Sequence, residues 1–275
     1  MSAGWVAGTV RARALVAQLP APSLMSEVAA CVSLDRAADR LEETVYGEHV
    51  HPGMSGIELQ RALATAVLWR LRVLAGWVPL GGAALVRALA GWFEIRAIEE
   101  RLAALHGASV PPPYAMGRLG VVASKAASAT SVEALRRLLA PSVWGDPGDM
   151  APAPLRAHLL ARWAARLRRE APEARPWVDD AVALSVMRDV RAGRRASPAA
   201  SEQQSTTTAA LWSAEQVWWD RVAVDARRML HARLGSREVV VGACALMAVD
   251  AHHMSSAIEL AAGGGGSLET IDAIA

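Results

Sequence analysis

The chain has 275 residues, 53% of them hydrophobic, which is enough to bury a large core in one to three domains. Alanine supplies much of that hydrophobic share and favours helix, whereas the aromatic residues that suit strands amount to 5%. The net charge is +2, Lys125 is the only lysine, and 27 acidic residues are interspersed with the arginines. The composition therefore predicts an all-α protein and argues against nucleic-acid binding.

The cysteines and the longest uncharged stretches indicate in which cellular compartment the protein works and whether it spans a membrane. Cys31 and Cys244 each lie in an apolar helical pattern, which is typical of buried free thiols in a reducing compartment and not of a disulfide or metal framework. The uncharged stretches 73–86 and 102–117 are interrupted by prolines and fall short of the roughly 18 residues that a membrane-spanning helix needs. We therefore expect a soluble or peripheral protein.

Helical periodicity covers most of the chain. Apolar residues recur every three or four positions over residues 59–74, and residues 85–105 predict a second long helix that Gly107 ends. Two further helices are predicted over residues 212–234 and 238–262.

Residues 155–169 form an amphipathic pattern with one apolar face and one arginine face, which we interpret as a solvated stripe. The residues expected to point inward are Leu155, Leu159, Leu160, Trp163 and Leu167, and those expected to point outward are Arg162, Arg166 and Arg169.

Serine followed by an apolar residue and an acidic one is typical of a helix N-cap, and this pattern occurs at Ser33, Ser131 and Ser267. Residues 194–210 are polar, small and without periodicity, so they predict a loop. The run of glycines at 263–266 predicts a break after the last long helix.

The chain contains an internal repeat. Residues 33–48, SLDRAADRLEETVYGE, return 98 residues later as 131–146, SVEALRRLLAPSVWGD. Tyr46 and Gly47 near the end of the first copy correspond to Trp144 and Gly145 in the second. A repeated unit buries its apolar face on its neighbours, so repetition favours a scaffold over a single catalytic site.

A second regularity suggests three units. An acidic residue is followed 13 positions later by glycine at Glu94 and Gly107, Asp180 and Gly193, and Asp250 and Gly263. We predict helical units over residues 1–80, 81–195 and 211–275, with a linker loop at 196–210.

Catalytic, nucleotide-binding and zinc motifs were not found in the sequence. Neighbouring residues on a helix point about 100° apart, so we interpret His252 and His253 as contact residues and not as metal ligands. Asp179 and Asp180 would bind magnesium only if further carboxylates converged on them, and a solvated or capping pair is favoured. We interpret Trp218 and its neighbour as core or interface anchors, because no basic cluster accompanies them.

Four segments resemble one protein family. They are VRARALVAQL, SLDRAADRLEETVYGE, LVRALAGWFEIRAIEERLAALHG and ALMAVDAHHMSSAIELAAGG. Together they resemble the C subunit, called d in eukaryotes, of V-type and A-type rotary ATPases. In that family an arginine-containing first helix leads to a segment ending in Tyr-Gly, and a repeated helix carries an aromatic-acidic pair, here Phe93 and Glu94. The family usually has asparagine shortly after the acidic position, where this chain has Arg96 and Ala97 in one unit.

The resemblance implies a fold and a function. The subunits of that family form a funnel of three helical domains round a pseudo-threefold axis. The funnel sits on the proteolipid ring and holds the end of the central shaft. The resemblance thus implies a non-catalytic rotor adaptor without cofactors, cytoplasmic and peripheral to the inner face of the plasma membrane. Its partners would be the shaft subunits and the proteolipid ring of a machine that transports protons or sodium ions.

Two other functions stay open at this point. An α-helical repeat scaffold for an unrelated partner would stack its units in an open row. An all-α metal-dependent enzyme would use Asp179, Asp180 and distant carboxylates that converge on one cavity.

Overall fold

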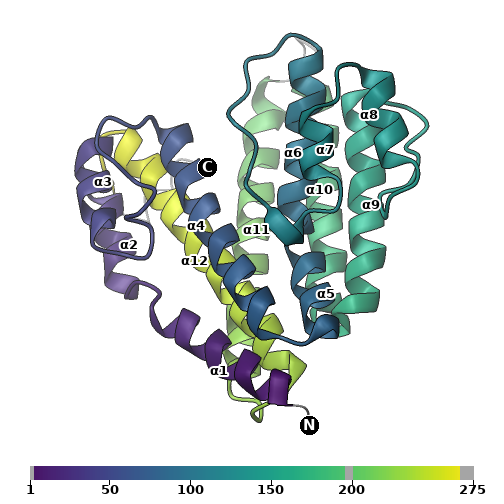
Figure 1. The fold of residues 1–275 in the computed structure, drawn as a ribbon. Coiled ribbons are helices and arrows are strands. Elements are labelled where there is room, and N and C mark those ends of the chain that lie inside the picture. The colour runs from purple at the N-terminus through teal and green to yellow at the C-terminus, as the bar shows by residue number, and fades with distance from the viewer. Residues whose placement is uncertain (1–2, 196–200, 267–275) are drawn as a thin grey trace. The chain divides into compact units, whose positions relative to one another are not determined.

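The computed structural model describes residues 3–195 and 201–266, and within these ranges every regular element is a helix (Figure 1). The predicted all-α class is confirmed. By contact, the chain divides into two compact units. Unit 1 contains Met1–Arg70 and Arg195–Ala275, and unit 2 contains Leu71–Arg194. The division into three consecutive units with the boundaries given above stays a prediction.

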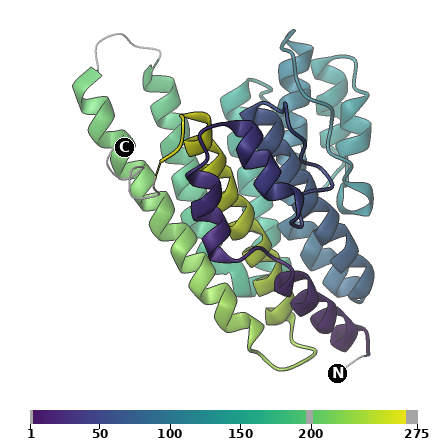
Figure 2. The same cartoon turned by 90° about the vertical axis from the view of Figure 1, so that its left-hand side faces the viewer.

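Unit 1 is built around its last helix. It contains α1 (Ala3–Ala17), α2 (Pro22–Ala29), α3 (Leu34–Glu42), the first part of α4 (Gly56–Trp77), α11 (Ser201–Leu230) and α12 (Arg237–Ala262). α12 contacts α11, α1, α2 and α3, and α11 and α12 run side by side in both ribbon views (Figures 1 and 2). Segments from the two ends of the sequence therefore share one core.

The contact between α1 and the turn that joins α11 to α12 is polar. The guanidinium of Arg13 donates to the carbonyls of Leu230, at 2.8 Å, and Ala232, at 2.6 Å. The N–H of Gly235 donates to Thr9 Oγ1 at 3.1 Å, and Gly235 has a φ of 82°. These bonds satisfy the end of α11, where backbone carbonyls lack helical partners.

Unit 2 is built around α6 (Gly91–Leu105). The other elements are the end of α4, α5 (Leu80–Leu89), the 3₁₀ turn Gly117–Leu119, α7 (Ala123–Ala127), α8 (Val132–Leu139), α9 (Pro152–Glu170), the 3₁₀ turn Pro172–Ala174 and α10 (Arg175–Arg195). α6 contacts α5, α7, α8 and α9. The core cluster of this unit joins α6, α7, α8 and α9, and that of unit 1 joins α12, α2, α3 and α4.

Two predictions about helix extent were wrong. Residues 85–105 form two helices, because α5 ends at Leu89 and α6 begins at Gly91. A side chain at position 91 would place its Cβ 2.8 Å from Trp163 Cδ1, so the close packing of α6 on this indole ring favours glycine at the start of the helix. Residues 201–210 are helical in α11, where no glycine or proline interrupts the chain before Gly235. α10 also extends to Arg195, and residues 196–200 lie outside the described ranges.

Other helix predictions are confirmed. The expected apolar face of α4 is buried, and Gly107 follows α6 with a φ of 89°. Gly264 and Gly265 also have positive φ after α12 ends. Within the described residues one helix, α12, is long and apolar enough by composition to cross a membrane. However, 67% of its most apolar window is buried inside the structure. A core helix has the same composition.

Candidate functional site

The two copies of the sequence repeat begin with the same cap. Ser33 Oγ accepts a hydrogen bond from the N–H of Arg36 at 3.4 Å, and Ser131 Oγ accepts one from the N–H of Ala134 at 3.1 Å. Each cap satisfies an N–H that has no partner within the helix, as predicted. Ser267 lies outside the described residues.

The copies also end in the same turn. Thr44 Oγ1 donates to the carbonyl three residues earlier at 2.6 Å and accepts from the N–H of Tyr46 at 3.1 Å. In the second copy Ser142 Oγ donates to the carbonyl three residues earlier at 2.7 Å and accepts from the N–H of Trp144 at 3.1 Å. Both turns therefore aim a large aromatic side chain into the core of their unit, where Tyr46 and Trp144 are buried.

The glycine after each aromatic residue has its own reason. A Cβ at Gly47 would lie 1.8 Å from the carbonyl oxygen of Glu42, so only glycine fits that backbone. Gly145 has a φ of 70°, which favours glycine for conformational reasons. The Tyr-Gly and Trp-Gly pairs thus combine a core side chain with a turn residue.

In unit 1 the aromatic residue contacts a carboxylate. The phenol of Tyr46 donates to Asp250 Oδ2, and Asp250 lies in the middle of α12. Burial raises the pKa of Asp250, while the Tyr46 hydrogen bond and the positive charge of Arg70 act against that rise. Burial also raises the pKa of Tyr46 well above its ordinary value. Tyr46 therefore acts as a neutral donor at physiological pH.

Arg70 completes the unit 1 cluster from α4. It is 3% exposed, and it donates to Gln18 Oε1 at 2.9 Å and to the carbonyl of Leu15 at 3.3 Å. Burial lowers the pKa of Arg70, and the nearby Tyr46 and Asp250 oppose that shift. Arg70 thus ties the end of α1 to α4 and places a positive charge near Asp250.

In unit 2 the equivalent carboxylate is Glu94 on α6, which is 1% exposed. Its Oε1 accepts from the N–H groups of Val121, Val122 and Ala123 at 2.6, 2.6 and 2.9 Å. Its Oε2 accepts from Trp144 Nε1 at 3.0 Å. Four donors therefore hold this carboxylate, three of them at the start of α7, where the helix dipole favours a negative charge.

Arg166 on α9 corrects the sequence interpretation. It was expected on the outer arginine stripe, but it is 9% exposed and buried. Burial lowers the pKa of Arg166, and the charge of Glu94 is the largest influence that opposes the shift. The amphipathic pattern failed here because Arg166 lies on the inner side of α9, where the charge of Glu94 on α6 offsets only part of the cost of burial.

The two arginines could have been found from a longer alignment of the repeat. Leu59 and Leu63 of α4 lie 96 positions before Leu155 and Leu159 of α9, and all four are buried. Arg70 and Arg166 are separated by the same 96 positions. The repeat extends into α4 and α9, and an insertion between the hairpin and the helix conceals it. Each unit therefore carries one buried aromatic donor, one acid and one arginine.

Asp180 and Gly193 occupy a different setting. Both lie within α10, so Gly193 does not follow a helix end as Gly107 and Gly263 do. Asp179 forms an ion pair with Arg168, and its side chain is 54% exposed, which fits a solvated pair. In the described part of the chain no three His, Cys, Asp or Glu side chains lie close enough to hold a metal ion.

The histidine and tryptophan pairs meet in unit 1. Trp219 of α11 stacks on His252 of α12, with ring centroids 4.4 Å apart and planes 16° from parallel. Burial lowers the pKa of His253. The two pairs anchor α11 on α12, so the tryptophans serve packing as expected. Cys244 is buried with its pKa raised to about 12 by burial, and Cys31 is half-buried.

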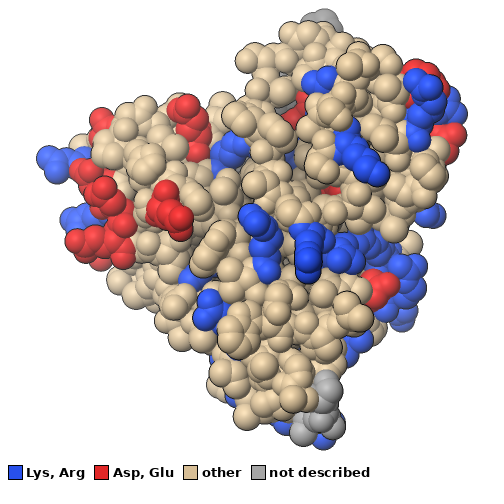
Figure 3. All heavy atoms as spheres, viewed as in Figure 1, with Lys and Arg blue, Asp and Glu red and all other residues tan. Residues whose placement is uncertain are grey.

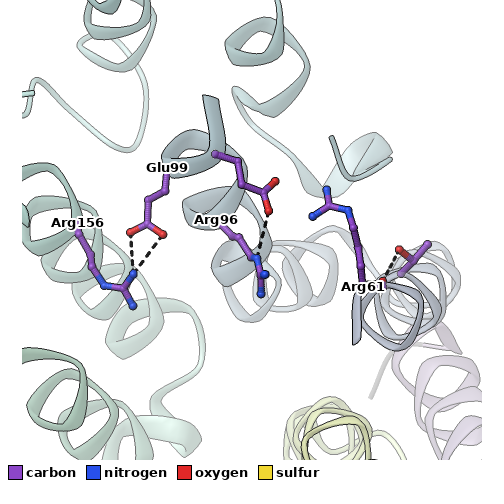
Figure 4. A network of polar contacts seen from close by, with 6 residues as sticks. Arg61, Arg96, Glu99 and Arg156 are labelled. Atoms are coloured by element: carbon purple, nitrogen blue, oxygen red, sulfur yellow. Dashed lines mark hydrogen bonds and ion pairs between the residues drawn. The ribbon is translucent and has the colours of Figure 1, made fainter. Parts of the chain in front are cut away.

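Ion pairs reinforce the surroundings of Glu94. Glu99 of α6 faces Arg156 of α9 at 3.2 Å, and Arg96 pairs with Glu100 one turn along α6 at 3.2 Å (Figure 4). The side chains of Glu99 and Arg156 are each about a quarter exposed, so water screens this pair only partly. α6 and α9 are therefore joined by polar as well as apolar contacts.

The chain matches no protein-family model, and it matches no curated protein in sequence.

Proposed function

We propose that the chain is a non-catalytic adaptor that joins the central shaft of a V-type or A-type rotary ATPase to its proteolipid ring. The proposal rests on the resemblance of the segments that contain Tyr46, Glu94 and Asp250 to the C subunit family. In this proposal the adaptor turns with the rotor and contacts the membrane through the ring.

The repeated cluster is the observation that supports an adaptor. Glu94 and Asp250 are two of the three carboxylates that the spacing to glycine identified, and both accept hydrogen bonds from the aromatic residue of a repeat copy. Buried charges used in this way position helices, and removal of one partner leaves an uncompensated charge. A subunit that transmits torque must be stiff. Closely packed interiors have low compressibility and transmit strain, so helices fixed by buried contacts suit that role.

Recovery of partners tests the proposal. The tagged full chain, produced in the cells that encode it, should be purified from detergent-solubilised membranes and its partners identified by mass spectrometry. We expect shaft and proteolipid subunits in stoichiometric amounts, together with ATP hydrolysis. A Gly47→Val variant, in which the first repeat cannot form its turn, serves as the misfolded control. Recovery of the folded chain without either class of subunit would overturn the rotor proposal.

A helical scaffold for another partner is the second candidate. The division of the chain into two compact units favours a scaffold, because members of the rotor family are expected to have three helical domains. In that case the same purification should yield a soluble partner in stoichiometric amounts and no membrane subunits.

A further inference from the structure

Each unit has a depression on its repeated hairpin, and the two linings share three equivalent positions. In unit 1 a depression of about 620 Å³ lies along α2 and α3, and in unit 2 one of about 430 Å³ lies along α7 and α8. Glu27 and Asp39 line the first, and Lys125 and Arg137 line the second. Lys125 follows Glu27 by 98 positions and Arg137 follows Asp39 by 98, which is the spacing of the repeat.

Two of these equivalent positions carry opposite charges. The unit 1 depression has Glu27, Asp39, Glu43 and Arg40 among its lining residues, a formal charge of −2. Arg40 pairs with Glu27 at 3.4 Å, and both side chains stay about half exposed. The unit 2 depression has two basic residues and a formal charge of +2. In Figure 3 acidic side chains gather over the α2 and α3 region.

The reversal is confined to part of the hairpin. Asp35 corresponds to Glu133, and Glu48 corresponds to Asp146, so the sign of the charge is unchanged at these positions outside the depressions. Lys125, the only lysine of the chain, stands at one of the reversed positions. The difference therefore follows the depression and not the general charge of each unit.

We propose that the acidic α2–α3 depression of one copy of this chain binds the basic α7–α8 depression of a second copy. Two hairpins of the same architecture can pack about an approximate twofold axis, which brings Glu27 to the second copy's Arg137 and Asp39 to the second copy's Lys125. Each copy has one surface of each kind, so the contact is heterologous and joins copies head to tail. Exposed ion pairs are individually weak and screened by salt, so the association is weak and favoured at low ionic strength.

Charge reversal with complementation tests this contact. Variant A carries Glu27→Lys and Asp39→Arg, and variant B carries Lys125→Glu and Arg137→Asp; all four positions are exposed. Sedimentation of the full-length proteins at low salt should show self-association of the natural chain. Variant A and variant B alone should associate at least tenfold more weakly, and an equimolar mixture of the two should regain association. Circular dichroism establishes that each variant is folded.

A matched control separates the depressions from overall charge. Glu42→Lys with Asp220→Arg gives the same change in net charge as variant A at exposed positions outside both depressions. We expect it to associate within threefold of the natural chain.

Three results would overturn the contact: a natural chain that stays monomeric at low salt, variants that associate as well as the natural chain, or a mixture that fails to regain association. None of these results depends on recovery of rotary ATPase subunits, so this inference and the rotor proposal fail separately.

Discussion

Glu94 and Asp250 occupy equivalent places in the two units, but the units hold them differently. Glu94 accepts hydrogen bonds from three backbone N–H groups and from Trp144. In the described part of the chain Asp250 accepts a hydrogen bond from Tyr46 alone. The carboxylate of unit 2, Glu94, therefore has four hydrogen-bond donors. The carboxylate of unit 1, Asp250, has one donor among the described residues and lies near the positive charge of Arg70.

The sequence contributes to this difference. Asp250 is one methylene shorter than Glu94. In unit 1 the positions that correspond to the three N–H donors are Ser23, Leu24 and Met25, in the first turn of α2. The N–H of Leu24 is already bonded to the carbonyl of Ala21. The same architecture thus tolerates two levels of charge compensation, and substitutions in the two units should differ in cost.

The largest expected effect is on unit 2, from Glu94→Gln. The amide could still accept from the start of α7, but its NH₂ would face the indole N–H of Trp144, two donors in a buried site. We expect a loss of about 3 kcal/mol in the free energy of unfolding, as for a buried hydrogen-bonded charge that loses its compensation. Urea unfolding measures the loss, and hydrogen exchange of α6 amides localises it.

Glu99→Gln is the matched control on the same helix. Glu99 is partly exposed in its ion pair with Arg156, and the loss there should stay below about 1 kcal/mol. Equal losses at the two positions would mean that the Glu94 site contributes no more than an ordinary partly exposed pair.

Substitution of the turn glycines should cost more stability in unit 1 than in unit 2, the reverse of the order expected for the carboxylates. Gly47→Ala would force a Cβ to within 1.8 Å of a backbone carbonyl oxygen, so the turn must shift. We expect a loss of about 2 to 3 kcal/mol for Gly47→Ala, by analogy with overpacked sites. Gly145→Ala meets no such contact and should lose about 1 kcal/mol for its positive φ. Thermal and urea unfolding of both variants would detect a reversed order, which would exclude the steric explanation.

Removal of the aromatic donor should cost more in unit 2 than in unit 1. Trp144→Phe removes the Nε1 donor to Glu94 and leaves a cavity, for an expected loss of about 2 kcal/mol. Tyr46→Phe removes only the hydroxyl, and Asp250 can take up a proton, so the expected loss is about 1 kcal/mol. Chemical unfolding compares the two, and a costlier Tyr46→Phe would show that Asp250 depends on its single donor.

Local signals in the sequence predicted much of the fold. Apolar periodicity located α4, α9 and α12, and the Ser33 and Ser131 caps follow from backbone donors that any helix start leaves open. The break before Gly91 was not predicted, and the contact of Gly91 with Trp163 joins residues that lie far apart in the sequence. Glycine within a helical pattern is often tolerated, so the pattern alone indicated one helix.

The candidate site was predicted in part. The repeat identified Tyr46 and Trp144, and the spacing to glycine identified Glu94 and Asp250, but nothing in the sequence paired them. Arg70 and Arg166 were missed because an arginine on an amphipathic helix is usually solvated. Their burial depends on carboxylates contributed by other helices, which single-helix periodicity does not include.

The smallest expected effect is Asp250→Asn, and it depends on pH. Because burial raises the folded-state pKa of Asp250 above its ordinary value of 3.8, the folded protein binds the proton more tightly than the unfolded chain. The stability contributed by this group is present at acid pH and is lost as pH rises through the raised pKa. Asparagine carries no charge and still accepts from Tyr46, so Asp250→Asn should be neutral or stabilising by less than about 1 kcal/mol at neutral pH.

This advantage over the natural chain should shrink as the pH falls toward the ordinary carboxyl pKa, because the natural side chain becomes protonated. Urea unfolding of both proteins at a series of pH values, with hydrogen exchange of α12 amides to isolate unit 1, measures the trend. A variant that is less stable than the natural chain at neutral pH, with a deficit that disappears in acid, would mean that the ionised Asp250 is stabilised by Arg70. In that case the carboxylates of the two units would be compensated alike, despite their different numbers of donors.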